Sequence, residues 1–126
     1  MVVKGRRKVV FVVDDDAGMR KSIALLLDKF GFDTQLYASA EAFLSTAGFS
    51  QIRNSCIVVD IQLDGMSGIE LARQISQTGH ALPIIFITGN DNESLRKAAL
   101  QQDCIAYLAK PFPAKALMDA IDQALA

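Results

Sequence analysis

The chain has 126 residues, of which 51% are hydrophobic and 21% charged, a composition typical of one globular domain and not of a disordered chain. Thirteen basic and fourteen acidic residues give a formal net charge of −1, which provides no overall field to attract nucleic acid or an anionic membrane. No uncharged stretch approaches the roughly 20 residues of a membrane span, and the apolar run at 9–13 is too short for a secretory signal. We therefore predict a single cytoplasmic domain over residues 1–126, with a flexible start at 1–7, no membrane segment and no direct contact with nucleic acid.

The first half of the chain predicts two strand–helix units. Residues 9–13 form a continuous apolar run, typical of a strand covered on both faces of a parallel sheet, and residues 34–37 form a weaker strand. The helix between them is predicted from apolar residues at three- and four-residue steps and from Gly31, which is suited to end it. Ser39 is predicted to cap a short second helix. The predicted inward positions are Met19, Ile23, Leu26, Leu27 and Phe30 in the first helix and Ala42, Phe43 and Ala47 in the second.

The second half predicts three further units. Residues 56–59 and 84–87 are again continuous runs rich in β-branched residues, and residues 105–109 form a weaker fifth strand. Ser67 and Asn92 are predicted to cap the third and fourth helices. Five alternating strands and helices predict an α/β fold, with a parallel sheet, right-handed crossovers and helices on both faces. The predicted inward positions are Ile69, Ala72 and Ile75, then Leu95, Ala98 and Ala99, and in the last helix Ala114, Leu117, Met118, Ile121 and Leu125.

Charged and hydroxyl side chains stand where four of the predicted strands end. Aspartates at 14–16 follow the first strand, Asp60 ends the third, Thr88 the fourth and Lys110 the fifth. Each taken alone is explained as a helix cap or a loop residue, but the carboxyl ends of parallel strands meet at one edge of a sheet, where these groups would converge. Clustered carboxylates repel one another, and a hard cation such as Mg²⁺ relieves the conflict while sharing a phosphoryl group. The hydroxyl and the ammonium suit further phosphate oxygens.

Several segments resemble the receiver domain of two-component response regulators, from about Lys8 to the C-terminus. The family motifs are Val13-Asp14-Asp15-Asp16, Asp60 with Gly68 eight positions later, Ile87-Thr88-Gly89 and Tyr107-Leu108-Ala109-Lys110-Pro111-Phe112. The FixJ-type subgroup is most similar at Met19-Arg20-Lys21-Ser22, Ser39-Ala40-Glu41-Ala42-Phe43-Leu44 and Met66-Ser67-Gly68-Ile69-Glu70-Leu71. The resemblance implies a doubly wound (βα)5 flavodoxin-like three-layer sandwich, with five parallel strands in the order 2-1-3-4-5.

The resemblance also implies roles for the matching positions. Asp60 would take a phosphoryl group from the phosphohistidine of a sensor histidine kinase, with Lys110 and Thr88 completing the catalytic set. Asp15 would bind Mg²⁺ directly and Asp14 through water, and the backbone carbonyl of Gln62 and Asp60 would complete the metal ligands. Thr88 and Tyr107 would form a switch pair, in which the hydroxyl moves toward the phosphoryl group and the ring turns inward. The Lys110–Pro111 peptide bond would be cis.

The implied protein is a signalling switch in transcription regulation, not an enzyme that turns over a metabolite. It would catalyse only its own Mg²⁺-dependent phosphorylation and dephosphorylation. A homodimer through the fourth helix, fifth strand and fifth helix, and a DNA-binding output domain beyond Ala126, remain open. Two alternatives are an aspartate-nucleophile phosphatase resembling the haloacid dehalogenases, which would need a D-x-D nucleophile on the first strand and an acidic pair after Lys110, and a degenerate receiver that only binds partners.

Two positions depart from the family pattern. Asp64, followed by Gly65, stands where the family usually has proline, which predicts a looser loop after the third strand and a solvent-facing Asp64 carboxylate. On this interpretation, Asp64→Pro should raise Mg²⁺ affinity and Asp64→Asn should change little. Asp103 replaces a common glycine, which predicts a left-handed backbone there. Cys56 and Cys104 are predicted to be buried free thiols.

Overall fold

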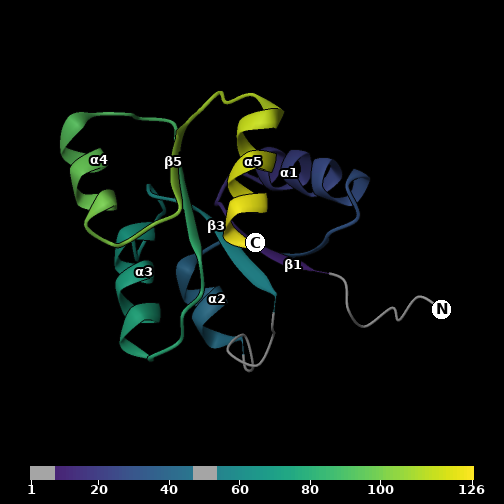
Figure 1. Cartoon of the computed structure of the whole chain (residues 1–126). Coiled ribbons are helices and arrows are strands. Elements are labelled where there is room, and N and C mark those ends of the chain that lie inside the picture. Colours follow the sequence, from purple (N-terminus) through teal and green to yellow (C-terminus); the bar gives the residue numbers. More distant parts are fainter. Residues whose placement is uncertain (1–7, 47–53) are drawn as a thin grey trace.

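The computed structural model describes residues 8–46 and 54–126, which form a five-stranded parallel sheet between two layers of helices (Figure 1). The predicted flexible start at 1–7 and the predicted inward position Ala47 lie outside the described residues. The strand order β2-β1-β3-β4-β5 confirms the order that the family resemblance implied. The strands are β1 (Val9–Val13), β2 (Asp33–Tyr37), β3 (Ser55–Asp60), β4 (Ile84–Thr88) and β5 (Ala106–Ala109).

The capping residues predicted for three of the helices stand at their N-termini, whereas the last helix begins after Pro113 without a side-chain cap. The side chains of Ser39, Ser67 and Asn92 each accept a hydrogen bond from the backbone N–H three residues later, as predicted, and Asp16 does the same for the first helix. None of the helices within residues 8–46 and 54–126 is long and apolar enough to cross a membrane. The helices are α1 (Ala17–Lys29), α2 (Ala40–Ser45), α3 (Gly68–Gln77), α4 (Glu93–Leu100) and α5 (Ala114–Ala124).

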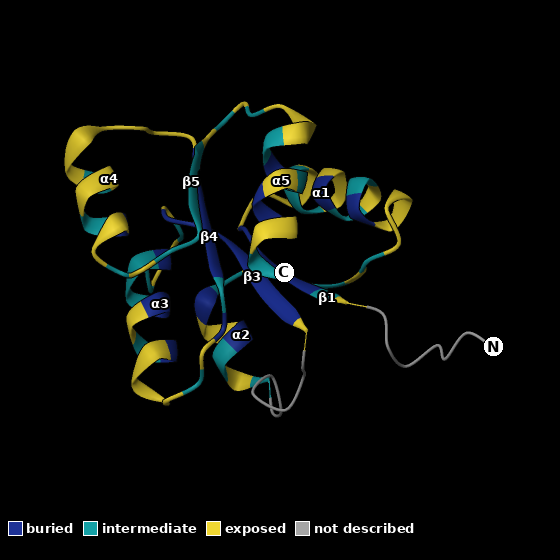
Figure 2. Cartoon of the chain, in the orientation of Figure 1, coloured by how far each residue is buried: buried dark blue, intermediate teal, exposed yellow. Residues whose placement is uncertain are grey.

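The central strands β1, β3 and β4 are almost wholly buried, which explains their continuous apolar sequences (Figure 2). Alternate residues along these strands belong to two separate cores, because successive side chains of a strand point to opposite faces of the sheet. One core packs against α2 and α3, the other against α1 and α5. The first includes Phe11, Phe43, Val59, Leu71, Ile75 and Phe86, and the second Val12, Leu27, Val58, Ile87, Leu117 and Ile121.

Three helix positions predicted to face inward lie at the surface instead. Phe30 is 58% exposed, because α1 has already ended and Phe30 caps its last turn. Ala42 is exposed, because α2 has only six residues and buries the row that holds Phe43. Ala114 is exposed as the first residue of α5. Helical periodicity identified these helices, but the ends of short helices depart from it.

The sequence also made predictions for the backbone at Asp103 and for the burial of the two cysteines. Asp103 has a φ of 58°, which confirms the predicted left-handed backbone after α4. Cys56 is buried in β3, and this burial raises the pKa of its thiol to about 12, so the thiol stays protonated at neutral pH. Cys104 is half-buried, contrary to the prediction of full burial, because it lies in the turn before β5.

Candidate functional site

The predicted site residues meet at the carboxyl edge of the sheet. Val13 pairs with Val59 across β1 and β3, so the next residues of the two segments, Asp14 after β1 and Asp60 at the end of β3, are neighbours. Asp14, Asp15 and Asp60 each place one carboxylate oxygen within 4.8 Å of the others. Three oxygen donors at this spacing fit a hard divalent cation, which takes carboxylate oxygens and keeps part of its water shell. These carboxylates could therefore hold a metal ion such as Mg²⁺.

Lys110 brings a positive charge to this cluster from the end of β5. Its Nζ donates to Asp14 Oδ2 at 2.9 Å and to Asp60 Oδ2 at 2.8 Å. The Lys110 side chain is 16% exposed, while Asp14 is fully buried and Asp60 nearly so. One ammonium thus faces two buried carboxylates, which leaves the site with excess negative charge.

The three aspartates differ in how many partners they already have. Both oxygens of Asp14 are engaged, because Oδ1 accepts from the Asp16 N–H at 2.9 Å and Oδ2 from Lys110. Asp60 Oδ1 likewise accepts from the Gln62 N–H at 2.9 Å. Asp15 is exposed, and its Oδ2 accepts a longer hydrogen bond of 3.3 Å from the Asp64 N–H. Asp15 is therefore the carboxylate best able to coordinate a cation directly.

Burial dominates the electrostatics of Asp60. Burial raises the pKa of the Asp60 carboxyl above its usual range, and the hydrogen bonds from Lys110 and Gln62 offset only part of this shift. For Lys110, burial acts to lower the pKa, but the hydrogen bonds to Asp60 and Asp14 outweigh it and raise the pKa. An added cation beside Asp60 would favour its ionised form.

We expect Asp60→Asn to raise the melting temperature of the metal-free protein at pH 7 by about 4 °C, the size of a ~1 kcal/mol effect in a domain of this length. Because the folded-state pKa of Asp60 is raised, the folded state binds this proton more tightly, and wild-type stability falls as the pH rises from the unfolded to the folded pKa. The variant does not titrate there, so its advantage should vanish below about pH 4. Thermal unfolding followed by circular dichroism at several pH values checks this, and an advantage that grows toward low pH would contradict it.

Thr88 and Tyr107 lie on adjacent strands and on the same face of the sheet. Tyr107 pairs with Phe86 across β4 and β5, and Thr88 lies two residues further along β4. Thr88 is buried, and its Oγ1 accepts from the Asn90 N–H at 3.1 Å. The Tyr107 ring packs partly against the core that includes α3. This placement suits residues that would move together.

A charged pair on the α4 side holds Tyr107 at the surface, and no sequence pattern predicted it. The Tyr107 hydroxyl donates to Asp91 Oδ1 at 2.9 Å, and Arg96 donates to Asp91 Oδ2 at 2.8 Å. The Arg96 guanidinium also lies over the Tyr107 ring, 5.4 Å from its centroid. Burial first, and then the hydrogen bond to Asp91, raises the pKa of the Tyr107 hydroxyl. We call Tyr107, Asp91 and Arg96 the tyrosine latch.

The loop from 61 to 67 makes hydrogen bonds to other segments that the sequence did not predict. The Asp64 side chain is exposed as expected, but its N–H reaches Asp15, and the Met66 N–H donates to Glu41 Oε2 at 3.0 Å. Proline lacks an N–H, so the predicted gain in Mg²⁺ affinity for Asp64→Pro is revised to a loss. Gly68 begins α3 so close to β3 that a side chain there would collide with the Asp60 carbonyl.

Two further features were implied by the sequence at this edge. The Lys110–Pro111 peptide bond is cis, the isomer that the resemblance implied. Gln62 lies exposed on the loop after β3. The resemblance implied that its backbone carbonyl oxygen is the third protein ligand, and a carbonyl oxygen is a metal ligand that suits the same hard cation.

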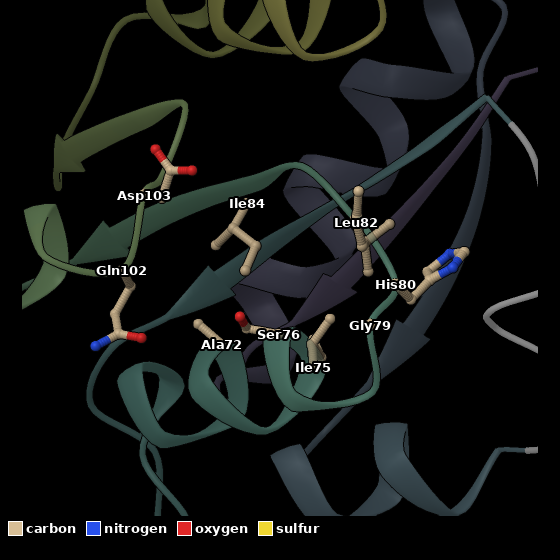
Figure 3. Close-up of a pocket in the computed structure, with 10 residues that line it drawn as sticks. Ala72, Ile75, Ser76, Gly79, His80, Leu82, Ile84, Gln102 and Asp103 are labelled. Carbon is tan, nitrogen blue, oxygen red and sulfur yellow. The ribbon is translucent and has the colours of Figure 1, made fainter.

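A cavity of about 290 Å³ lies away from this cluster, between α3, the start of β4 and the turn that follows α4 (Figure 3). Its lining includes Ile75, His80, Ile84 and Asp103. Ile84 is the first residue of β4, whereas Thr88 is the last, so the cavity lies at the opposite edge of the sheet from the carboxylates. The cavity therefore has no part in the acidic site.

Comparisons with known proteins point to the same family as the sequence motifs. A family model described as response regulator receiver domain matches residues 10–122. The chain is 34% identical to the transcriptional regulatory protein TdiR of Thauera aromatica, over 97% of this chain and 53% of that protein. It is 35% identical to the transcriptional regulatory protein FixJ of Rhizobium meliloti (strain 1021), over 91% of this chain and 55% of that protein. The chain thus spans about half the length of these relatives.

Solved structures agree in fold. The crystal structure of FixJ-N has a TM-score of 0.85 with 34% identity and covers 94% of each chain. A structure of the response regulator StyR has a TM-score of 0.82 with 37% identity, over 94% of this chain and 59% of that one. The chain therefore belongs to the response regulator receiver domain family, the phosphoacceptor signalling switches of two-component systems.

Proposed function

We propose that Asp60 is the phosphoacceptor of this receiver domain and takes its phosphoryl group from the phosphohistidine of a sensor histidine kinase. The observation that carries the proposal is the position of Lys110 Nζ, 2.8 Å from Asp60 Oδ2, within a cluster of three carboxylates. A buried carboxylate beside an ammonium and two further oxygen donors is suited to attack phosphorus while the charge of the phosphoryl group is neutralised.

In the proposed transfer, an Asp60 carboxylate oxygen attacks phosphorus as the P–N bond to the donor imidazole breaks. Asp15 would hold Mg²⁺ directly, Asp14 would act through water, and Asp60 and the Gln62 carbonyl would complete the set. When bound, Mg²⁺ neutralises charge on the phosphoryl oxygens and positions them. Lys110, already against Asp60, would contact another phosphoryl oxygen.

The switch is proposed to act through Thr88 and Tyr107. The Thr88 hydroxyl would leave the Asn90 N–H and donate to a phosphoryl oxygen on Asp60. The Tyr107 side chain would then leave its contacts with Asp91 and Arg96, and its ring would turn inward. A phosphoryl group can shift this equilibrium because it contacts Thr88 in one of the two states only. The surface of α4, β5 and α5 would change with it.

The role in the cell follows from the same proposal. Self-catalysed, Mg²⁺-dependent phosphorylation and dephosphorylation at Asp60 would set the lifetime of the signal. Relatives that are named transcriptional regulatory proteins extend well beyond the length matched here, which supports an output in transcription regulation through a DNA-binding domain outside this chain. A homodimer through α4, β5 and α5 and the cytoplasmic location stay predictions.

Incubation with a small acyl phosphate and Mg²⁺ tests the proposal. Intact mass should increase by one phosphoryl group that is labile to base, chelation of Mg²⁺ should suppress the reaction, and Asp60→Asn should remain unmodified. Asp64→Asn is the matched control, because it removes an exposed carboxylate of the same loop and should leave the yield unchanged. Equal modification of wild type and Asp60→Asn would overturn the assignment. A protein that takes no phosphoryl group under any condition would favour the degenerate receiver.

A further inference from the structure

We propose that Glu41 is a positioning residue for the metal site, and that it acts by fixing the loop from 61 to 67 so that the Asp64 N–H orients the Asp15 carboxylate. This role rests on the proposed function, in which Asp15 binds Mg²⁺. Glu41 itself lies in the first turn of α2 and belongs to none of the strand ends that form the carboxylate cluster.

The contact between Glu41 and the loop is close and specific. Glu41 Oε2 accepts from the Met66 N–H at 3.0 Å, although the two residues are 25 positions apart. Gly65 has a φ of 76°, and a Cβ on it would lie 2.5 Å from the same oxygen. Glycine at 65 thus permits both the left-handed backbone and the close approach of the carboxylate. The Met66 N–H also holds the pKa of Glu41 below its usual range, so Glu41 is ionised at neutral pH.

Three N–H groups at alternate positions of the loop donate to carboxylates on three different segments of the chain. The Gln62 N–H donates to Asp60 at the end of β3, and the Asp64 N–H donates to Asp15 after β1. The Met66 N–H donates to Glu41 on α2. Two of these acceptors belong to the proposed metal site and the third does not, which makes Glu41 the outer anchor of the loop.

The Asp64 N–H sets the orientation of Asp15. The hydrogen bond from this N–H to Asp15 Oδ2 is long, at 3.3 Å, so a small displacement of the loop would break it. Hydrogen bonds to a ligating carboxylate orient it, and their loss typically weakens metal binding by about 10- to 100-fold. Met66 lies two positions after Asp64. If its N–H lost the hydrogen bond to Glu41, the loop would be free to carry the Asp64 N–H away from Asp15.

The test compares Mg²⁺ binding, by amide NMR titration, in wild type, Glu41→Ala and Glu41→Gln. Glu41→Ala should weaken binding by about tenfold, whereas Glu41→Gln keeps an oxygen acceptor and should retain most of the affinity. Glu70→Ala is the matched control, because Glu70 is also a glutamate in the first turn of a helix but pairs with Arg73. Circular dichroism verifies that each variant is folded.

A second readout does not depend on metal. In the metal-free protein, hydrogen exchange at the Met66 and Asp64 amides should be faster in Glu41→Ala and close to wild type in Glu41→Gln. Asp64→Ala keeps the N–H and should bind Mg²⁺ nearly as wild type does, whereas Asp64→Pro removes the N–H and should bind more weakly. Adding Glu41→Ala to Asp64→Pro should then weaken Mg²⁺ binding little further, because in this proposal Glu41 acts on the metal site only through the hydrogen bond from the Asp64 N–H to Asp15, which Asp64→Pro has already removed.

The outcomes separate this role from the proposed function. If Asp15→Asn loses Mg²⁺ binding while Glu41→Ala binds as wild type does, the positioning role is wrong and the metal site stands. Unchanged exchange at Met66 in Glu41→Ala would overturn the role as well. If Asp15→Asn binds Mg²⁺ like wild type, the metal assignment fails, and faster exchange in Glu41→Ala would then support only the anchoring of the loop.

Discussion

Lys110→Ala is expected to destabilise the metal-free protein by about 3 kcal/mol at pH 7, because it leaves buried charges without their partner. Asp14 is fully buried and Asp60 nearly so, and both accept from Lys110 Nζ. Removing the Lys110 ammonium takes away the positive charge that offsets the repulsion between these two carboxylates. Urea unfolding followed by circular dichroism measures the loss. Saturating Mg²⁺ should recover part of the lost stability, since the cation replaces the missing positive charge.

Lys115→Ala provides the control for this prediction. The Lys115–Asp119 pair has a similar N···O distance of 2.8 Å, but its side chains are 83% and 63% exposed. Exposed pairs contribute about 0–1 kcal/mol, so this variant should be nearly as stable as wild type. The difference between the two variants should shrink at low pH, because the raised pKa of Asp60 lets this carboxyl take up a proton and lose the charge that Lys110 offsets. A Lys110→Ala variant that loses no more stability than Lys115→Ala would contradict the account of the site.

Asp15→Asn is expected to weaken Mg²⁺ binding by more than about tenfold, and by more than Asp14→Asn does. Asp15 is exposed and accepts one long hydrogen bond, whereas both oxygens of Asp14 are engaged by Asp16 and Lys110. Asp15 can therefore coordinate the cation directly, and Asp14 would act through water. Amide NMR titration with Mg²⁺ measures both affinities.

Asp16→Asn is the matched control for the metal prediction. It removes the same charge from the same run of aspartates, but Asp16 caps α1, and asparagine caps a helix equally well. Its Mg²⁺ affinity should stay close to that of wild type. Equal losses in Asp15→Asn and Asp16→Asn would mean that the general negative potential attracts the cation, and that Asp15 is not a ligand.

The positions of the central strands were predictable from the sequence, because a strand that is buried on both faces has a continuous run of apolar residues. The runs at 9–13, 56–59 and 84–87 are the central strands, and their β-branched residues reflect two covered faces. The parallel topology then predicted that residues following separate strands would meet at one edge, as Asp14, Asp60 and Lys110 do. The strand order itself came from the family resemblance.

The contacts that the sequence did not predict depend on how helices and loops sit against the sheet. The tyrosine latch joins Asp91 and Arg96, near the start of α4, to Tyr107 on β5, and no spacing rule links these positions. The bond between Asp64 and Asp15 uses a backbone N–H, which every residue except proline carries, so the side chain at 64 gives no sign of it. Only the positions of the neighbouring elements reveal such contacts.

A phosphoryl group on Asp60 is expected to release Tyr107 from its contacts with Asp91 and Arg96. The most direct measurement is fluorine NMR of protein that carries 3-fluorotyrosine, with Tyr37→Phe used to assign the two tyrosine signals. Excess acyl phosphate and Mg²⁺ should move the Tyr107 signal to a second environment in wild type, while Asp60→Asn shows no change and Thr88→Ala is phosphorylated without the shift. A Tyr107 signal that stays unchanged while intact mass shows full phosphorylation would contradict the claim.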